Sequence, residues 1–226
     1  MDNQTNFTPA NPESITVFTT YFICELIIAL LAVVGNSAII VAFLSNRKLR
    51  TTQNYYIVSL AAIDFSMGFI AIPFVLITLD GTPYDNKGLC FFFLTCIVLM
   101  DLCSIFSVMA LTVDRYLAIC KPFSYHAIMT PRRTLIHISI AWIVPIAISL
   151  LVPLGWNIDD KSKSGCFFAD IVSMKYYTFL YVVCFLPLFF IMCGMYRKIF
   201  IVIQSQVLYK FEFLPTFKFA ALSYKL

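Results

Sequence analysis

The sequence predicts an all-α membrane protein built as an antiparallel bundle of transmembrane helices, and three observations support this prediction. Hydrophobic residues make up 61% of the 226 residues and charged residues only 12%, which is outside the usual balance of soluble domains. Five apolar segments are each long enough to cross a hydrocarbon core of about 30 Å as a helix. Lysine and arginine gather between alternate segments, which sets the direction of each crossing.

The predicted spans are separated by stretches that hold most charges and turn residues. The first span is too long for the core of a signal peptide, so we expect it to remain as an anchor. We divide the chain into an extracellular amino-terminal segment (1–16), a bundle (17–203) and a cytoplasmic tail (204–226). The spans are expected at residues 17–43, 54–78, 89–113, 134–153 and 176–203.

The distribution of basic residues predicts an extracellular amino terminus at the plasma membrane. Arg47 and Lys48 follow the first span and Arg132 and Arg133 precede the fourth, whereas residues 1–16 hold no lysine or arginine. The net charge of +4 is therefore assigned to contacts with the inner leaflet, and no nucleic-acid partner is expected. Two Asn-x-Thr triplets, starting at Asn3 and Asn6, are candidate glycosylation sites; an unmodified polar tail is the alternative.

Two of the eight cysteines, Cys90 and Cys166, fall outside the membrane in this topology. We predict a disulfide between them that holds the loop after the fourth span over the mouth of the bundle. The other six are interpreted as free thiols that pack as small apolar groups.

Three acidic residues, Glu25, Asp64 and Asp101, lie within predicted spans. An ionised carboxylate at that depth costs about 3 kcal/mol or more, so each is expected to face the interior of the bundle and find a partner. Metal-spaced clusters, glycine-rich phosphate loops and nucleophile–base pairs are not recognisable in the sequence, so an enzyme is not expected.

Several motifs, in order along the spans, resemble those of the rhodopsin-like G-protein-coupled receptors. They are Gly35-Asn36, Ser59-Leu60-Ala61-Ala62-Ile63-Asp64, Cys90, Asp114-Arg115-Tyr116, Trp142 and Pro187. The resemblance implies that Asp114 holds Arg115 at the cytoplasmic end of the third helix until activation frees the arginine to meet a Gα subunit. An arginine that extends to the lipid interface is the alternative. The resemblance also implies that Asp64 and Ser104 bind an allosteric sodium ion. A water-filled polar network without an ion is the alternative. No other cofactor is expected.

Within this family the chain is most similar to adenosine receptors. The similarity is carried by Glu25, Ala71-Ile72-Pro73-Phe74, Ser104-Ile105-Phe106-Ser107, Thr130-Pro131-Arg132-Arg133, Leu154-Gly155-Trp156-Asn157 and Cys166-Phe167-Phe168. It implies a small extracellular ligand, an adenosine-like nucleoside, stacked on Phe168. The ligand-binding candidates are Phe168, Ile97, Val98, Asp101 and Glu25.

Two departures from the adenosine-receptor pattern make a different ligand an alternative. Ala169 replaces the glutamate that would bond the adenine amine, and Asp101 replaces a threonine on the ribose side. An amine-type receptor that uses Asp101 as a counter-ion is therefore an alternative, as is a hydrogen bond of Asp101 within the bundle.

The segment after residue 203 is too short and too polar to provide the sixth and seventh spans of such a receptor. We therefore expect a truncated form whose tail lies on the inner leaflet. The alternative to a signalling receptor is a non-signalling partner that pairs with a complete receptor as a dimer and lowers its response.

Overall fold

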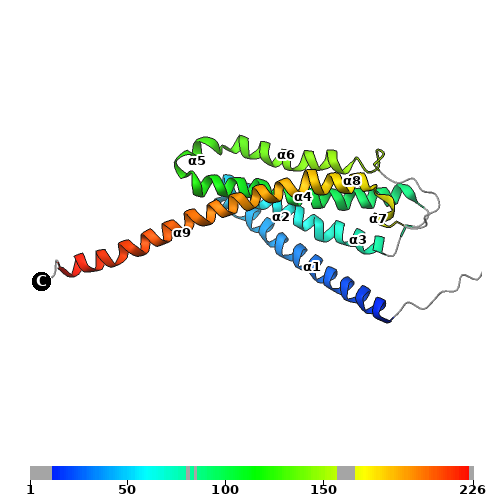
Figure 1. Cartoon of the computed structure of the whole chain (residues 1–226), viewed down its shortest axis with the longest axis horizontal. Coiled ribbons are helices and arrows are strands. Elements are labelled where there is room, and N and C mark those ends of the chain that lie inside the picture. The colour runs from blue at the N-terminus through cyan, green and yellow to red at the C-terminus, as the bar shows by residue number, and fades with distance from the viewer. Residues whose placement is uncertain (1–11, 80–81, 84–85, 157–165, 224–226) are drawn as a thin grey trace, which may run out of the picture.

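The computed structural model describes residues 12–79, 82–83, 86–156 and 166–223, and every element in these ranges is a helix. Five helical segments are long and apolar enough to cross a membrane. The helices run side by side in alternating directions, and only the outer ends of α1 and α9 diverge from the bundle (Figure 1). The predicted all-α class and five spans are thus confirmed, whereas Asn3 and Asn6 lie outside the described residues.

The first two spans are joined by a short connection. The first is α1 (Pro12–Ser45), and the second is divided into α2 (Thr52–Ser66), η2 (Met67–Ala71) and α3 (Ile72–Leu79). Between them, η1 (Arg47–Leu49) starts at Asn46, whose side chain accepts a hydrogen bond from the Lys48 backbone N–H at 3.0 Å. The η2 segment is a π-helix, which inserts a wider turn and changes the direction of the side chains that precede it.

The third and fourth spans have clear start and stop signals. The third, α4 (Lys87–Cys120), begins after Asn86, whose Oδ1 accepts a hydrogen bond from the Leu89 N–H at 3.0 Å. It ends before Pro122, since a residue that precedes proline disfavours the helical conformation. The short α5 (Pro122–Ile128) and the fourth span, α6 (Pro131–Ser149), each start with proline, which suits the first helical turn.

The fifth span is also interrupted by a π-helix. It consists of α8 (Met174–Thr178), η3 (Phe179–Phe185) and α9 (Leu186–Ser223), and α7 (Phe168–Ile171) precedes it. The third helix continues to Cys120 rather than ending at residue 113, and α9 continues beyond residue 203. Hydropathy marks the apolar part of a helix and not its end. Residues 114–120 of α4 and 204–214 of α9 contain no glycine or proline that would end these helices.

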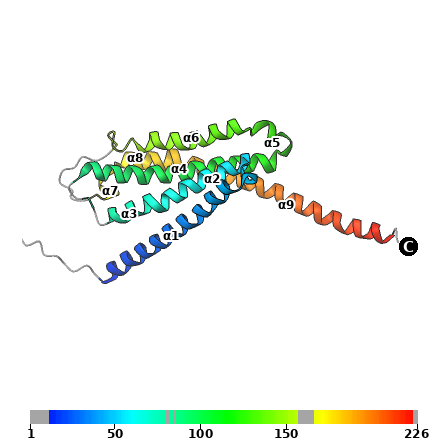
Figure 2. The same ribbon diagram turned by 180° about the vertical axis from the view of Figure 1, so that it is seen from behind.

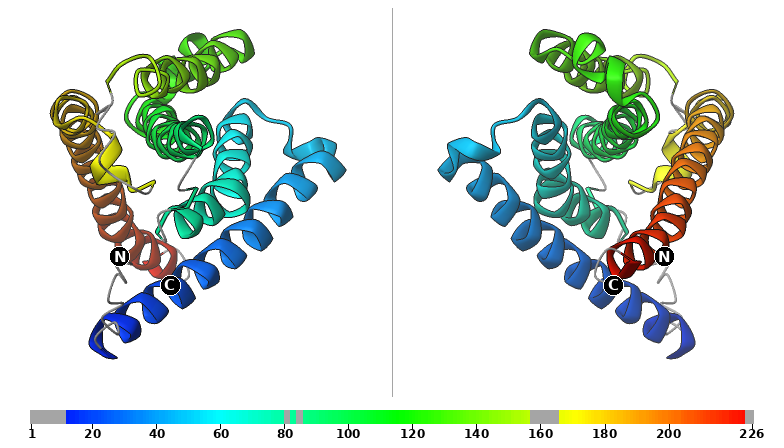
Figure 3. Two further views of the ribbon diagram at one scale, coloured as in Figure 1. Left: turned by 90° about the vertical axis from the view of Figure 1, so that its right-hand side faces the viewer. Right: turned by 90° about the vertical axis from the view of Figure 1, so that its left-hand side faces the viewer.

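Helix α4 lies at the centre of the bundle and contacts α2, α6 and α9. Figures 2 and 3 show α2 and α3 between α1 and α4, and Figure 3 shows α6 and α9 on other sides of α4. Two interhelical hydrogen bonds tie α2 to α6. Trp142 Nε1 donates to Ser59 Oγ at 3.1 Å, and Tyr56 Oη lies 2.9 Å from His137 Nδ1.

A cluster of buried residues occupies the end of the bundle that holds the cysteine pair. It joins α4 to the segment that follows α6 and to the fifth span. Its buried members are Cys90, Leu94, Val98, Leu102, Val152, Cys166, Val172, Tyr176 and Cys184. The candidate functional site lies next to this cluster and shares Val98 and Leu102 with it.

Candidate functional site

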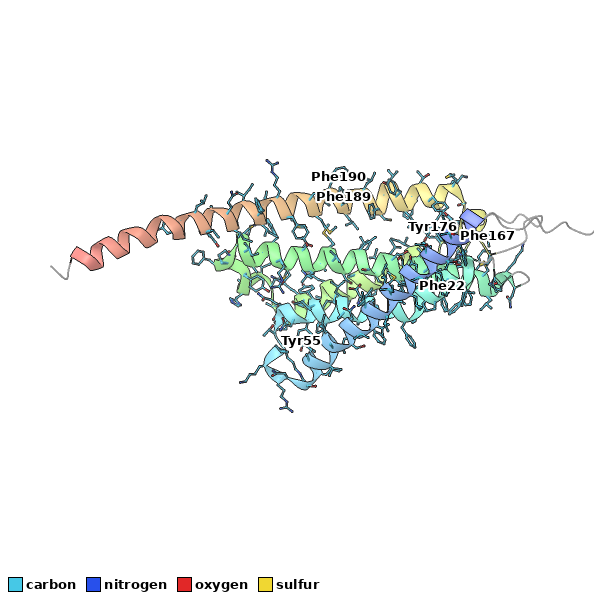
Figure 4. The ribbon with its side chains drawn as sticks, turned by 90° about the horizontal axis from the view of Figure 1, so that it is seen from below. Phe22, Tyr55, Phe167, Tyr176, Phe189 and Phe190 are labelled. Carbon is cyan, nitrogen blue, oxygen red and sulfur yellow. A yellow bond between two sulfur atoms is a disulfide. The ribbon has the colours of Figure 1, made fainter. Side chains whose placement is uncertain are left out.

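A cavity of about 300 Å³ opens between α4, α7, α8 and η3. Its wall consists of Val98, Asp101, Leu102, Ile105, Phe168, Tyr177, Leu180, Tyr181 and Phe185. Figure 4 shows Phe167 and Tyr176, the sequence neighbours of two wall residues, at the same end of the bundle as Phe22 and at the opposite end from Tyr55. The cavity therefore lies toward the end that the sequence predicts to be extracellular.

The predicted disulfide between Cys90 and Cys166 is present, with the two Cα atoms 5.7 Å apart. Both cysteines are buried, Cys90 at 2% exposure and Cys166 at 0%. Because Cys166 comes two residues before Phe168, the bond ties the start of α7 to the start of α4. The disulfide thereby places the Phe168 ring at the edge of the cavity.

Three of the five predicted ligand residues, Phe168, Val98 and Asp101, line this cavity. Ile97 does not line the cavity. Consecutive residues of a helix point about 100° apart, and the Ile97 side chain packs against the buried cluster. Glu25 lies on α1 and is also absent from the wall. The structure therefore brings together α4 and the segment after the disulfide, and it leaves α1 outside the site.

Among the residues that the structure describes, Asp101 is the one acidic side chain in the cavity wall. Its neighbours in the wall are hydrocarbon side chains and aromatic rings. Within the described residues, Asp101 forms no hydrogen bond or ion pair. A carboxylate in such surroundings is poorly compensated, so it is the strongest polar feature that a ligand in this cavity would meet.

Asp64 and Ser104 approach each other between α2 and α4, and Ser104 Oγ donates a hydrogen bond to Asp64 Oδ1 at 3.3 Å. Oxygen ligands suit a hard cation such as sodium, and these two side chains supply part of the six or so that such ions take. The described residues contain no group of three histidine, cysteine or acidic side chains that could hold a metal ion. These residues would fit a sodium ion only together with water or other oxygens.

A second polar cluster surrounds Asp114 at the far end of α4. The carboxylate of Asp114 is fully buried, and its Oδ1 accepts a hydrogen bond from Tyr125 Oη at 2.7 Å. Its Oδ2 lies 3.9 Å from Arg115 Nε and accepts no hydrogen bond within the described residues. Arg115 is 36% exposed, and its Nη1 donates to Gln53 Oε1 on α2 at 3.4 Å. Arg115 thus has an acidic partner on its own helix and an amide partner on a neighbouring helix.

Tyr125 on α5 is the main hydrogen-bond donor to Asp114. Burial and, next, the hydrogen bond to Asp114 raise the pKa of Tyr125 to about 12. The phenol therefore remains protonated and able to donate over the whole physiological pH range.

Replacing Tyr125 with phenylalanine is expected to lower the free energy of unfolding by about 1–3 kcal/mol, since a buried carboxylate oxygen loses its donor. Titration with a denaturing detergent in mixed micelles measures this change. Tyr55→Phe is the matched control, because Tyr55 is exposed and its hydroxyl forms no hydrogen bond within the described residues. Equal effects of the two substitutions would contradict the assigned role of Tyr125.

The contact of Tyr125 with Asp114 was not predicted from the sequence. The available signal was Pro122, which stops α4 and starts α5, so that the chain turns back toward the end of α4. The aromatic wall residues Tyr177, Tyr181 and Phe185 were also missed. Their direction depends on the π-helical turn of η3, which has no recognisable sequence signal.

Comparisons with known proteins show which family of proteins this chain is similar to. Residues 35–211 match the family described as "7 transmembrane receptor (rhodopsin family)". Among similar proteins, adenosine receptor A2b of Gallus gallus is 34% identical over 85% of this chain and 62% of its own length. Adenosine receptor A2a of Homo sapiens is 34% identical over 84% of this chain and 49% of its own length. Adenosine receptor A2b of Homo sapiens is 35% identical over 83% of this chain and 61% of its own length.

The chain therefore spans about half to three-fifths of the length of these relatives. The matched region includes the cavity wall, the disulfide and the Asp114–Arg115 pair, so the similarity covers every part of the candidate site. The chain belongs to the rhodopsin family of seven-transmembrane receptors.

Proposed function

We propose that this chain forms the ligand-binding and G-protein-facing part of a receptor for a small extracellular ligand. One observation carries the proposal: the single helix α4 lines the cavity through Asp101 and also holds the Asp114–Arg115 pair. At 1.5 Å per residue, these two positions are about 20 Å apart along one helix. A ligand that shifts or rotates α4 would therefore act on both sites at once.

The proposed location is the plasma membrane, with the amino terminus outside. Large apolar side chains such as Leu30, Leu31 and Phe190 are 64–67% exposed on the outer spans, which suits contact with lipid acyl chains. The disulfide supports the orientation, because such bonds persist on the oxidising side of a membrane.

The proposed switch is Arg115, which has two sets of partners within reach. In the present state it lies between Asp114 and Gln53, neither at close range. A guanidinium group is permanently charged and presents five N–H donors, so it can pair with more than one set of acceptors. In the whole receptor, release from Asp114 would let Arg115 meet a heterotrimeric G protein.

The proposed ligand has a flat ring that stacks on Phe168. Phe168 lines the cavity and meets Tyr177 edge to face, with ring centroids 5.2 Å apart, so its ring is held in place. Adenosine is the first ligand of this class to test, because the relatives are named adenosine receptors.

Replacing Phe168 with alanine is expected to weaken the binding of adenosine by about 5- to 150-fold, since stacking on an aromatic ring contributes about 1–3 kcal/mol. Equilibrium binding of labelled adenosine to the chain in lipid nanodiscs measures this loss. Phe167→Ala is the matched control, because Phe167 is adjacent and exposed but does not line the cavity. Unchanged affinity in the Phe168 variant would contradict the proposed ligand position.

A further inference from the structure

Asp101 is the intramembrane acid for which the described part of the chain offers no partner. Two other acids on the spans have partners: Asp64 accepts from Ser104, and Asp114 accepts from Tyr125. Asp101 instead projects into the wall of the cavity, and none of its wall neighbours carries a positive charge. An ionised group at such depth is retained at a cost of about 3 kcal/mol or more unless something compensates it.

The remainder of the wall is suited to a cation. Four aromatic rings from three elements surround the space near Asp101: Phe168 from α7, Tyr177 from α8, and Tyr181 and Phe185 from η3. The faces of aromatic rings attract ammonium groups, most strongly when water is excluded. A carboxylate combined with several aromatic rings is therefore complementary to a positively charged group attached to an apolar body.

The size of the cavity limits the ligand. About 300 Å³ is at the lower end of the range for small-molecule sites, so the cavity suits a small ligand. A neutral ligand of this size would displace water from Asp101 without replacing its charge. A cationic ligand would supply the missing counter-charge.

We propose that the cavity binds a small organic monocation, a protonated amine attached to a ring, with the ammonium group paired to Asp101 and the ring against Phe168. The inference rests on the proposed function, because it takes the cavity to be the ligand site. It adds the charge of the ligand, which the proposed function leaves open.

The test compares two probes of nearly equal shape and different charge. 2-Phenylethylamine carries an ammonium group at neutral pH, and 2-phenylethanol carries a hydroxyl in the same place. Binding to the 226-residue chain in nanodiscs is measured by saturation-transfer NMR for the wild type, Asp101→Asn and Asp101→Glu. We expect Asp101→Asn to weaken binding of the amine by about tenfold, whereas Asp101→Glu retains it, because the Coulomb attraction depends on the charge. Binding of the alcohol is expected to be the same in all three proteins.

Glu25→Gln is the matched control, since it also removes an acid from a span but lies outside the cavity wall. Equal binding of the amine to wild type and Asp101→Asn would overturn the inference, as would an equal loss in Glu25→Gln. Adenosine binding distinguishes a failure of the cationic-ligand inference from a failure of the proposed function. If adenosine binding depends on Phe168 while the amine does not bind, the proposed function stands and the cationic ligand is rejected. If none of the three probes binds, both are rejected.

Discussion

Replacing Cys166 with serine is expected to lower the free energy of unfolding by about 2–4 kcal/mol and to weaken ligand binding together with it. The Cys90–Cys166 bond closes a loop over a sequence separation of 76 residues, and loss of such a bond enlarges the conformational freedom of the unfolded chain. The bond also lies inside the buried cluster, so the substitution leaves a thiol and a hydroxyl among apolar side chains. Titration with denaturing detergent and binding of adenosine measure the two effects.

Cys103→Ser provides the matched control for this prediction. Cys103 is buried on the same helix as Cys90 but is a free thiol, so the substitution makes the same change of atom without breaking a bond. We expect the Cys103 variant to lose much less stability than the Cys166 variant. A reducing agent should destabilise the wild type and leave a Cys90→Ala, Cys166→Ala double variant unchanged; a response of the double variant would contradict the prediction.

Replacing Gly68 with alanine is expected to lower the free energy of unfolding by about 1–3 kcal/mol through a forced separation of helices. A Cβ atom at Gly68 would lie 2.8 Å from the Ala29 carbonyl oxygen and 3.1 Å from both Ala32 Cβ and Val33 Cγ2. The first of these is a backbone atom of α1, which cannot move away by a rotation of a side chain. Since interhelical packing in membranes depends on such close approach, α1 should detach from the second span.

The control for Gly68 is Gly194→Ala on α9. An added Cβ atom at Gly194 meets nothing within 4 Å, so this variant should be neutral or slightly more stable because alanine favours a helix. Cross-linking between cysteines introduced in α1 and η2 reports on the separation of the helices directly. Similar stability of the Gly68 and Gly194 variants would show that the contact with α1 is not tight in the membrane.

The sequence was sufficient for features that depend on length, charge and order along the chain. Apolar length defined the five spans, and the predicted topology left Cys90 and Cys166 as a pair; the structure confirms the five spans and the disulfide. Features that depend on rotation about a helix axis were less accessible. Ile97 and Val98 are neighbours in the sequence, yet only Val98 faces the cavity.

Partners on different helices were the hardest to predict. Asp114 and Arg115 could be recognised as a pair through the resemblance to rhodopsin-like receptors, but Tyr125 and Gln53 reach them from α5 and α2. Hydrophobic periodicity says which face of a helix is buried and does not say which residue of another helix lies opposite. The Tyr125 contact follows from where α4 ends and how the chain turns back into α5, whereas the Gln53 contact depends on how α2 packs against α4.

The seven-residue π segment η3 has a consequence for how such a receptor can change during evolution. Each residue of an α-helix advances the chain by about 100°, so deletion of one residue that converted η3 to an α-helix would turn α8 by roughly that angle relative to α9. Tyr177 would then leave the cavity wall while α9 kept its contacts with α4. A single-codon insertion or deletion at this place could therefore reshape the ligand site without altering the end of the bundle that holds Asp114 and Arg115.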